Sequence, residues 1–217
     1  MNSFNIEKQS MWKCITKNKL ICNESDTLAI ILPGLGYTLD KALLDYSKQL
    51  ILDFKFDCLG IEYGFQVSRE SFNRQDENDI RELLLETLDI IFSALELGRG
   101  KYKRIILIGK SLGTVLQGKI HKEIKGNYDI HIKNIYLTPI NETFKEKLDK
   151  EGLIITGTKD TLISSENLEK IKSEGLRVLE IEDAGHSLCI KGNVLKSIKA
   201  LEIIIENIKD YLERMSI

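Results

Sequence analysis

The segment from Arg104 to Lys125 constrains the fold of this chain more than any other. Residues 104–108 are an apolar, largely β-branched run typical of a buried strand, residues 109–113 are Gly-Lys-Ser-Leu-Gly, and Thr114 to Lys125 have a helical pattern. A strand that passes into a helix over so few residues needs a sharp turn, which holds its central residue in strained geometry. Glycine at positions 109 and 113 fits such a turn, because a Cβ at either position would collide with the neighbouring strand and helix.

The arrangement strand, Gly-x-Ser-x-Gly, helix is that of a nucleophile elbow. It would place the hydroxyl of Ser111 at the carboxyl edge of a sheet and at the amino end of a helix, where developing negative charge is favoured. The five-residue pattern alone also arises by chance, so Ser111 as an ordinary turn residue is the alternative. The weight of the motif therefore depends on the partners that the rest of the chain supplies.

Two candidate partners each follow a predicted strand. Asp160 comes after the apolar run 153–156, and His186 comes after the alternating run 178–182. Loops at the carboxyl ends of parallel strands converge on one crevice, so we expect all three side chains to meet there. A serine is a poor nucleophile without a base. His186 would take the Ser111 proton and pass it to a leaving group, while Asp160 would hold the imidazole in the required tautomer.

Each partner has an alternative. Asp160 could cap the next helix, although Ser164 and Ser165 are better placed for that, and Glu142 is an alternative acid because it follows the preceding strand. His186 could be a surface histidine. The two other histidines do not follow a strand at the correct edge and are expected to be structural or solvated.

The order Ser111, Asp160, His186 resembles that of the α/β-hydrolase superfamily. A fourth motif, residues 32–37 (Leu-Pro-Gly-Leu-Gly-Tyr), is similar to the oxyanion loop of that superfamily, with Pro in place of the usual His. The resemblance covers residues 27 to about 212. It implies an α/β-hydrolase fold, which is a three-layer α/β/α sandwich with a mostly parallel central sheet. It also implies an oxyanion hole formed by the backbone N–H groups of Leu35 and Leu112.

Further residues are candidates for the substrate pocket by position alone, with ordinary packing as an equal alternative. They are Gly34, Gly36, Tyr37, Pro139, Ile140 and Leu162. Lys110, which precedes the candidate nucleophile, has two interpretations. It lies at the mouth of the site and attracts anionic substrates, or it is a solvated surface lysine.

Apolar runs alternate with helical patterns along the chain, which predicts a parallel sheet covered on both faces. The predicted strands are 28–32, 58–63, 105–109, 135–138, 153–156 and 176–181, and the clearest helices are 79–97 and 193–215. Residues 11–22 are expected to add a strand or hairpin at the amino-terminal edge.

The 217 residues predict a single domain, 1–217, with a minimal cap insertion around 139–152. That interval has room for one short helix at most, over 142–150. We therefore expect a compact hydrolase with an open pocket, which suits an acyl chain or ester that lies partly in solvent.

Composition excludes several classes of function. The chain is 42% hydrophobic and 29% charged, with a net charge of −2, so nothing favours nucleic acid. The absence of a signal-like or spanning apolar run predicts a cytoplasmic protein without stable membrane insertion. Dispersed cysteines (Cys14, Cys22, Cys58 and Cys189) predict reduced thiols. No metal or nucleotide motif occurs, so no cofactor is expected; the oligomeric state stays open.

These observations predict a hydrolase that cleaves a carboxylic ester or thioester of a small acyl substrate through an acyl-enzyme on Ser111. The same residues can hydrolyse an amide or peptide bond, which is the first alternative. The second alternative is a binding protein that has the hydrolase fold without a competent site.

Overall fold

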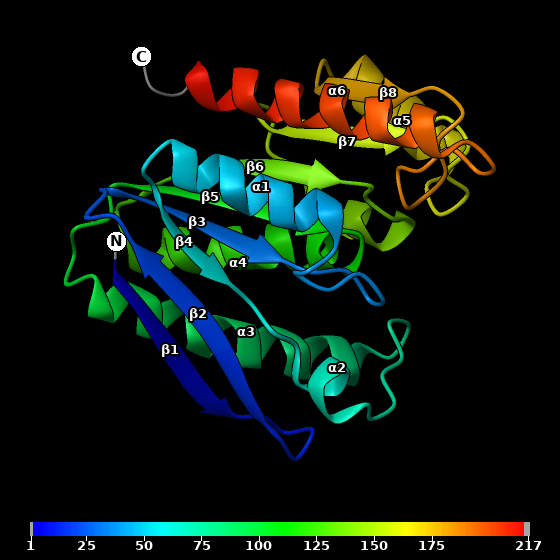
Figure 1. The fold of residues 1–217 in the computed structure, drawn as a ribbon. Coiled ribbons are helices and arrows are strands. Elements are labelled where there is room, and N and C mark those ends of the chain that lie inside the picture. Colours follow the sequence, from blue (N-terminus) through cyan, green and yellow to red (C-terminus); the bar gives the residue numbers. More distant parts are fainter. Residues whose placement is uncertain (1, 215–217) are drawn as a thin grey trace.

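The computed structural model describes residues 2–214, which form an eight-stranded sheet flanked by helices (Figure 1). The strand order is β1-β2-β4-β3-β5-β6-β7-β8. Strands β3 to β8 run parallel, whereas β2 is antiparallel to both β1 and β4. The strands are β1 (Asn2–Gln9), β2 (Ile15–Cys22), β3 (Thr27–Leu32), β4 (Asp57–Gly60), β5 (Arg104–Lys110), β6 (His131–Leu137), β7 (Leu153–Gly157) and β8 (Arg177–Ile181). The predicted mostly parallel sheet is confirmed.

Helices cover both faces of the sheet, which confirms the predicted three layers. The helices are α1 (Ala42–Asp53), α2 (Gly64–Ser68), α3 (Glu77–Leu97), α4 (Leu112–Asn127), α5 (Ser165–Ser173) and α6 (Val194–Glu213), with a 3₁₀ helix η1 (Asn141–Lys145). Helices α1 and α6 lie on one face, and α3 and α4 on the other (Figure 1). Among residues 2–214, no helix is long and apolar enough to cross a membrane.

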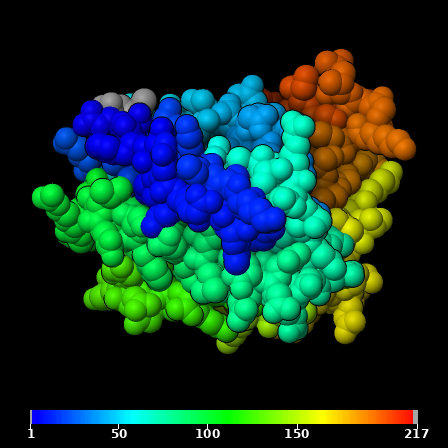
Figure 2. All heavy atoms as spheres, turned by 90° about the horizontal axis from the view of Figure 1, so that it is seen from below, coloured from blue at the N-terminus to red at the C-terminus, as the bar shows by residue number. Residues whose placement is uncertain are grey.

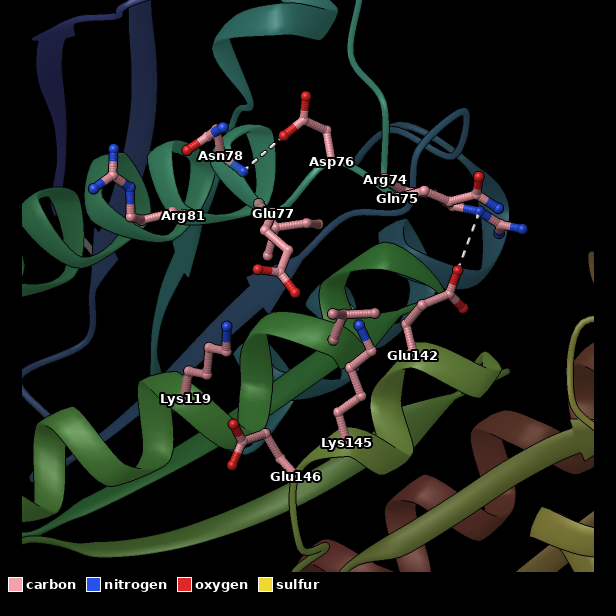
Figure 3. A pocket seen from close by; sticks show the side chains of 12 residues that line it. Arg74, Gln75, Asp76, Glu77, Asn78, Arg81, Lys119, Glu142, Lys145 and Glu146 are labelled. Atoms are coloured by element: carbon pink, nitrogen blue, oxygen red, sulfur yellow. Dashed lines mark hydrogen bonds and ion pairs between the residues drawn. The ribbon is translucent and has the colours of Figure 1, made fainter.

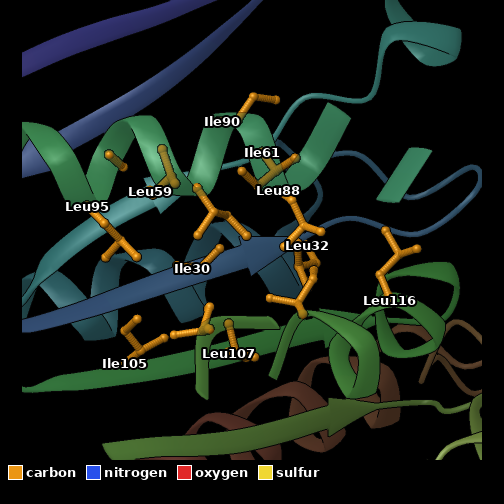
Figure 4. Packing of buried hydrophobic residues seen from close by; sticks show 14 of the residues in the cluster. Ile30, Leu32, Leu59, Ile61, Leu88, Ile90, Leu95, Ile105, Leu107 and Leu116 are labelled. Carbon is orange, nitrogen blue, oxygen red and sulfur yellow. The ribbon is translucent and has the colours of Figure 1, made fainter. Parts of the chain in front are cut away.

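Strand β5 shows why the central strands are continuous apolar runs. Ile105 and Leu107 belong to the cluster packed under α3 and α4 (Figure 4), whereas Ile106 and Ile108 belong to the cluster under α1 and α6. All four side chains are fully buried because successive residues of a strand point to opposite faces. Even-numbered residues of β5 therefore face α1 and α6, which fixes the side on which Lys110 lies.

The amino-terminal edge differs from the prediction. Strand β2 lies in the predicted interval 11–22, but its hairpin partner is the earlier segment β1, which the sequence did not indicate as a strand. Of the residues of β1, only Ile6 is buried, so the apolar pattern that would reveal a strand is missing. The hairpin lies on the molecular surface beside the segment that contains α2 (Figure 2), and β1 packs against α3.

Two predicted helices have different bounds. The last helix begins after Asn193, whose side chain accepts a hydrogen bond from the Lys196 N–H (3.0 Å), and it ends at Glu213; the predicted end at Met215 lies outside the described residues. The predicted helix 142–150 is instead the 3₁₀ helix η1. The Thr143 hydroxyl accepts from the Ile140 N–H at 3.1 Å, which tightens this turn.

The four cysteines carry free thiols. Cys58 is buried, Cys14 and Cys22 are partly buried, and Cys189 is exposed. Burial raises the pKa of the Cys58 thiol to about 12, so this group stays protonated at neutral pH.

The close contact between α4 and β3 generates a prediction about stability. A Cβ added to Gly113 would lie 2.4 Å from the Leu32 carbonyl oxygen. We expect Gly113→Ala to lower the free energy of unfolding by about 2–3 kcal/mol, because backbone must move to admit the methyl group. Urea denaturation followed by circular dichroism measures this change.

Gly126, in the same helix, is the matched control, because a Cβ there meets nothing within 4 Å. Gly126→Ala is expected to raise the free energy of unfolding by about 0.5–1 kcal/mol through helix propensity. Equal stability of Gly113→Ala and wild type would contradict the packing argument.

Candidate active site

The turn between β5 and α4 has the geometry that the sequence predicts. Ser111 has φ 52° and ψ −110°, a conformation that non-glycine residues rarely adopt. Its N–H donates to the Leu137 carbonyl of β6 at 2.9 Å, which fixes the turn to the sheet. A Cβ on Gly109 would lie 2.2 Å from Oε1 of Gln117, so the glycine permits this close approach. The Ser111 side chain thus stands at the carboxyl edge of the sheet.

Ser111, His186 and Asp160 form a continuous hydrogen-bonded chain. His186 Nε2 lies 2.8 Å from Ser111 Oγ, and His186 Nδ1 lies 2.8 Å from Asp160 Oδ2. A carboxylate only accepts hydrogen bonds, so Nδ1 carries the ring proton and Nε2 accepts from the serine hydroxyl. The Asp160 side chain is fully buried, whereas that of His186 is 28% exposed. The Asp160 carboxylate is therefore shielded from water, whereas the His186 imidazole is partly open to solvent.

The loops that carry Asp160 and His186 are joined to each other. The Lys159 N–H donates to the Ala184 carbonyl at 2.9 Å, and the Asp183 N–H donates to the Thr158 hydroxyl at 2.9 Å. A Cβ on Gly157 would lie only 2.1 Å from the Ala184 oxygen. Gly157, which comes three residues before Asp160, is thus required for the two loops to touch.

The alternatives for the acid lie elsewhere in the structure. Ser164 caps α5 by accepting from the Asn167 N–H at 3.2 Å, so Asp160 is not the cap of this helix. Asp160 Oδ1 accepts from the Leu162 N–H at 2.9 Å, which orients its second oxygen toward the histidine. Glu142 instead pairs with Arg74 at 3.6 Å. The structure thus brings Asp160, and not Glu142, to His186.

One backbone donor belongs to the elbow and a second to the loop 32–37, which packs against it through Gly34. The N–H groups of Leu35 and Leu112 make no hydrogen bond to any of residues 2–214, which leaves both free to meet an oxyanion. Gly34 packs against the elbow, since a Cβ there would lie 3.3 Å from the Lys110 oxygen. A two-bond turn between Gly34 and Tyr37 shapes the loop despite the Pro at its start.

Gln66 of α2 is a residue that the sequence did not single out. Its side-chain amide donates both protons to the loop 32–37, to the Gly34 oxygen at 2.6 Å and to the Leu35 oxygen at 2.9 Å. These bonds fix the peptide plane that contains the Leu35 N–H and the plane that follows it. No local motif marks this contact, because it joins residues 31 and 32 positions apart.

The position of Lys110 contradicts both interpretations that the sequence suggested. Its side chain is 1% exposed, so it lies neither at the mouth of the site nor in solvent. It points to the face of β5 that carries Ile106 and Ile108. Burial lowers the pKa of Lys110 to about 8, an effect that the negative charge of Asp160 partly offsets.

The other pocket candidates surround the elbow at different depths. Pro139 and Ile140 are buried in the turn after β6, and Leu162 is half-buried. Leu35 and Gly36 are exposed. Tyr37 lines a hollow of about 170 Å³ with residues of α1, the segment after His186 and α6. Burial raises the pKa of the Tyr37 hydroxyl, which therefore stays neutral.

A larger hollow of about 430 Å³ lies between α4, η1 and the start of α3 (Figure 3). The hollow is lined by four acidic and four basic side chains, which balance in charge: Asp76, Glu77, Glu142 and Glu146 against Arg74, Arg81, Lys119 and Lys145. None of the three hydrogen-bonded residues Ser111, Asp160 and His186 lines it. We therefore treat it as separate from the candidate site.

Solved structures share this fold over nearly the whole chain. An α/β serine hydrolase without a lid from Xanthomonas campestris superposes with a TM-score of 0.72 and 11% identity, covering 98% of this chain and 94% of that one. An esterase from Pyrococcus furiosus gives 0.68 and 17% identity over 98% and 92%. An α/β serine hydrolase homologue from Coxiella burnetii gives 0.63 and 16% identity over 95% and 98%. The chain therefore has the α/β-hydrolase fold.

Sequence comparison adds no closer relative. No protein-family model matches the chain, and no curated protein matches it significantly. Identities of 11–17% show the fold alone, so chemistry has to be argued from the residues of the site.

The contacts of Gln66 generate a prediction about the oxyanion loop. Gln66→Ala removes both donors to the loop carbonyls, so we expect faster hydrogen exchange of the Gly34 and Tyr37 amides, whose hydrogen bonds close the turn. Exchange followed by mass spectrometry or NMR measures this. Val67→Ala is the control, because Val67 is 45% exposed on the same helix and should leave exchange in the loop unchanged. Unaltered exchange in Gln66→Ala would show that the loop holds its shape without this side chain.

Proposed function

We propose that this protein is a serine hydrolase that cleaves a carboxylic ester or thioester through an acyl-enzyme on Ser111. The observation that carries the proposal is the unbroken chain from Ser111 Oγ through His186 to Asp160, with both distances at 2.8 Å. A serine hydroxyl paired in this way is the activated nucleophile that acyl transfer needs.

The first half of the reaction forms the acyl-enzyme. Ser111 Oγ attacks the carbonyl carbon while its proton moves to His186 Nε2, and Asp160 stabilises the imidazolium that results. The carbon–oxygen or carbon–sulfur bond of the tetrahedral intermediate then breaks, and the imidazolium gives its proton to the departing alcohol or thiol. The acyl group stays on Ser111 as an ester.

The second half reverses these roles with water. His186 takes a proton from a water molecule, whose oxygen attacks the acyl carbon. The carbon–Oγ bond breaks, Ser111 recovers its proton from the imidazolium, and the carboxylic acid leaves. No group outside this chain and water is required.

The oxyanion of each tetrahedral intermediate would be held by the N–H groups of Leu35 and Leu112. Both donors are free of other partners, and Leu112 begins a helix, whose amino end favours negative charge. One donor of this kind contributes roughly 2.7–4 kcal/mol to transition-state stabilisation. Because the donors are backbone groups, substitutions of these two leucines would alter the surroundings of the hole and leave the donors in place.

The proposed substrate lies partly in solvent. The connection between β6 and β7 contains η1 alone, and the Xanthomonas campestris hydrolase of similar fold is described as having no lid. The exposed Leu35 and Gly36 and the partly exposed His186 border the opening. Such a site suits an acyl ester whose alcohol or thiol portion projects outward.

The triad assignment predicts the effect of four substitutions on turnover of a short-chain p-nitrophenyl ester. Ser111→Ala and His186→Ala are each expected to lower kcat by at least about 10⁴-fold, and Asp160→Asn by about 10⁴-fold because it favours the wrong tautomer. Glu142→Ala is the matched control and should leave kcat unchanged, because Glu142 pairs with Arg74. A loss in Glu142→Ala equal to that in Asp160→Asn would reverse the assignment of the acid.

Intact mass after treatment with a fluorophosphonate tests the nucleophile itself. Wild type should gain one adduct as Ser111 Oγ displaces fluoride, His186→Ala should label slowly, and Ser111→Ala should not label. Comparison of ester, thioester and amide analogues of one acyl group then identifies the bond that is cleaved. Folded wild type that neither labels nor turns over ester would favour a binding protein over a hydrolase.

A further inference from the structure

Lys110 occupies a position where an aliphatic side chain is expected. It is the last residue of β5 and shares a face with Ile106 and Ile108, which are fully buried. With 1% of its surface exposed, it is among the most deeply buried charged residues of the described chain. A methionine would fill this space without the cost of removing an ammonium group from water.

The ammonium group is surrounded by two hydrogen-bond acceptors and one aromatic ring. Nζ donates to the Thr138 hydroxyl at 2.5 Å and to the backbone carbonyl of His186 at 3.0 Å. It also lies 5.1 Å from the centre of the Tyr37 ring, within the range of a cation–π contact. A single side chain therefore joins the end of β5, the turn after β6, the oxyanion loop and the loop of the candidate base.

The bond to His186 links the base to the nucleophile through the backbone. Lys110 is the chain neighbour of Ser111, and Ser111 is itself fixed to β6 by its N–H. Among residues 2–214, no other side chain donates a hydrogen bond to the His186 carbonyl. We propose that Lys110 is a positioning residue, which holds the backbone of His186 at the distance from Ser111 that proton transfer requires. The inference rests on the hydrolase function proposed above.

The charge state of Lys110 gives this role a dependence on pH. The titratable groups around it are Asp160 and His186 of the triad, the Cys189 thiol and the Tyr37 hydroxyl; the β6 turn contributes only the neutral Thr138. The pKa of Lys110 is lowered to about 8 by burial. Above that pH the amine keeps two N–H groups but loses the charge that strengthens both hydrogen bonds and the contact with the Tyr37 ring. The hold on His186 should therefore weaken on the alkaline side.

The same titration affects stability with a defined sign. The pKa of Lys110 is about 8 in the folded chain against an ordinary 10.5, so the folded state binds fewer protons between these two values. Stability attributable to this residue therefore rises with pH across that window. A Lys110→Met variant lacks this pH-dependent contribution to the free energy of unfolding. Its melting temperature relative to wild type should be highest at neutral pH and should fall as pH rises toward 10.5.

The test compares Lys110→Met, which removes charge and both hydrogen bonds, with Lys110→Gln, whose amide keeps two donors without charge. Ile108→Val is the control for a small core change on the same face. With a p-nitrophenyl ester, we expect Lys110→Met to lower kcat by roughly 10- to 100-fold with KM little changed, because the base is misplaced. Lys110→Gln should recover part of this loss, because its amide has two donors but no charge, and Ile108→Val should match wild type.

The pH profile separates positioning from packing. Wild type should lose kcat above about pH 8, and this alkaline decline should be absent from both Lys110 variants but present in Ile108→Val. A packing role would leave the profile unmoved. Wild-type kcat and an alkaline decline retained in Lys110→Met would overturn the proposal.

A spectroscopic measurement tests the inference even if the protein proves not to be a hydrolase. The ring proton on His186 Nδ1, bonded to Asp160, should give a low-field proton resonance that is absent from His186→Ala. We expect this resonance to broaden in Lys110→Met and to be partly restored in Lys110→Gln. Should the methionine variant fail to fold, Thr138→Val, which removes one of the two acceptors, should broaden the signal instead. An unchanged resonance in the folded variants would refute the positioning role, whereas absent ester turnover by wild type would refute only the hydrolase function.

Discussion

The approach of helix α4 to strand β3, without any intervening side chain, is the constraint on which the candidate site depends. Gly113 leaves no room for a methyl group beside the Leu32 carbonyl, and Gly109 leaves none beside Gln117. These two contacts hold both ends of the turn, and Ser111 between them takes a positive φ. The tight packing of the two layers thus supplies the free energy that keeps a strained residue in place.

A second contact of the same kind joins the other half of the site. Gly157 allows the loops after β7 and β8 to touch, so Asp160 and His186 are placed relative to each other by backbone. Lys110 then connects this pair of loops to the elbow. The two parts of the site are joined by the Ser111–His186 hydrogen bond and by Lys110, and Gln66 binds the loop 32–37 at its edge.

The sequence predicted those features that local pattern determines. The elbow is visible in residues 109–113, and the positions of Asp160 and His186 follow from the strands before them, because parallel strands end at one edge. Lys110 was misplaced because a lysine is ordinarily exposed, and only its tertiary contacts show otherwise. Strand β1 was missed because its exposed side chains carry no apolar alternation. Gln66 acts across the fold, where no local pattern can mark it.

The short connection between β6 and β7 has a consequence for how such a protein can change. Its backbone leaves the sheet beside the nucleophile and returns after η1, and part of it is exposed. Lengthening a flexible connection is inexpensive in entropy, since each doubling of its length costs only about 0.6 kcal/mol. Among the described residues, no hydrogen bond joins residues 146–152 to the elbow or to the two joined loops. Glu151 pairs with Lys133 near the start of β6, so residues inserted there would lie toward the amino edge of the sheet, away from the nucleophile, and the strands would keep their register.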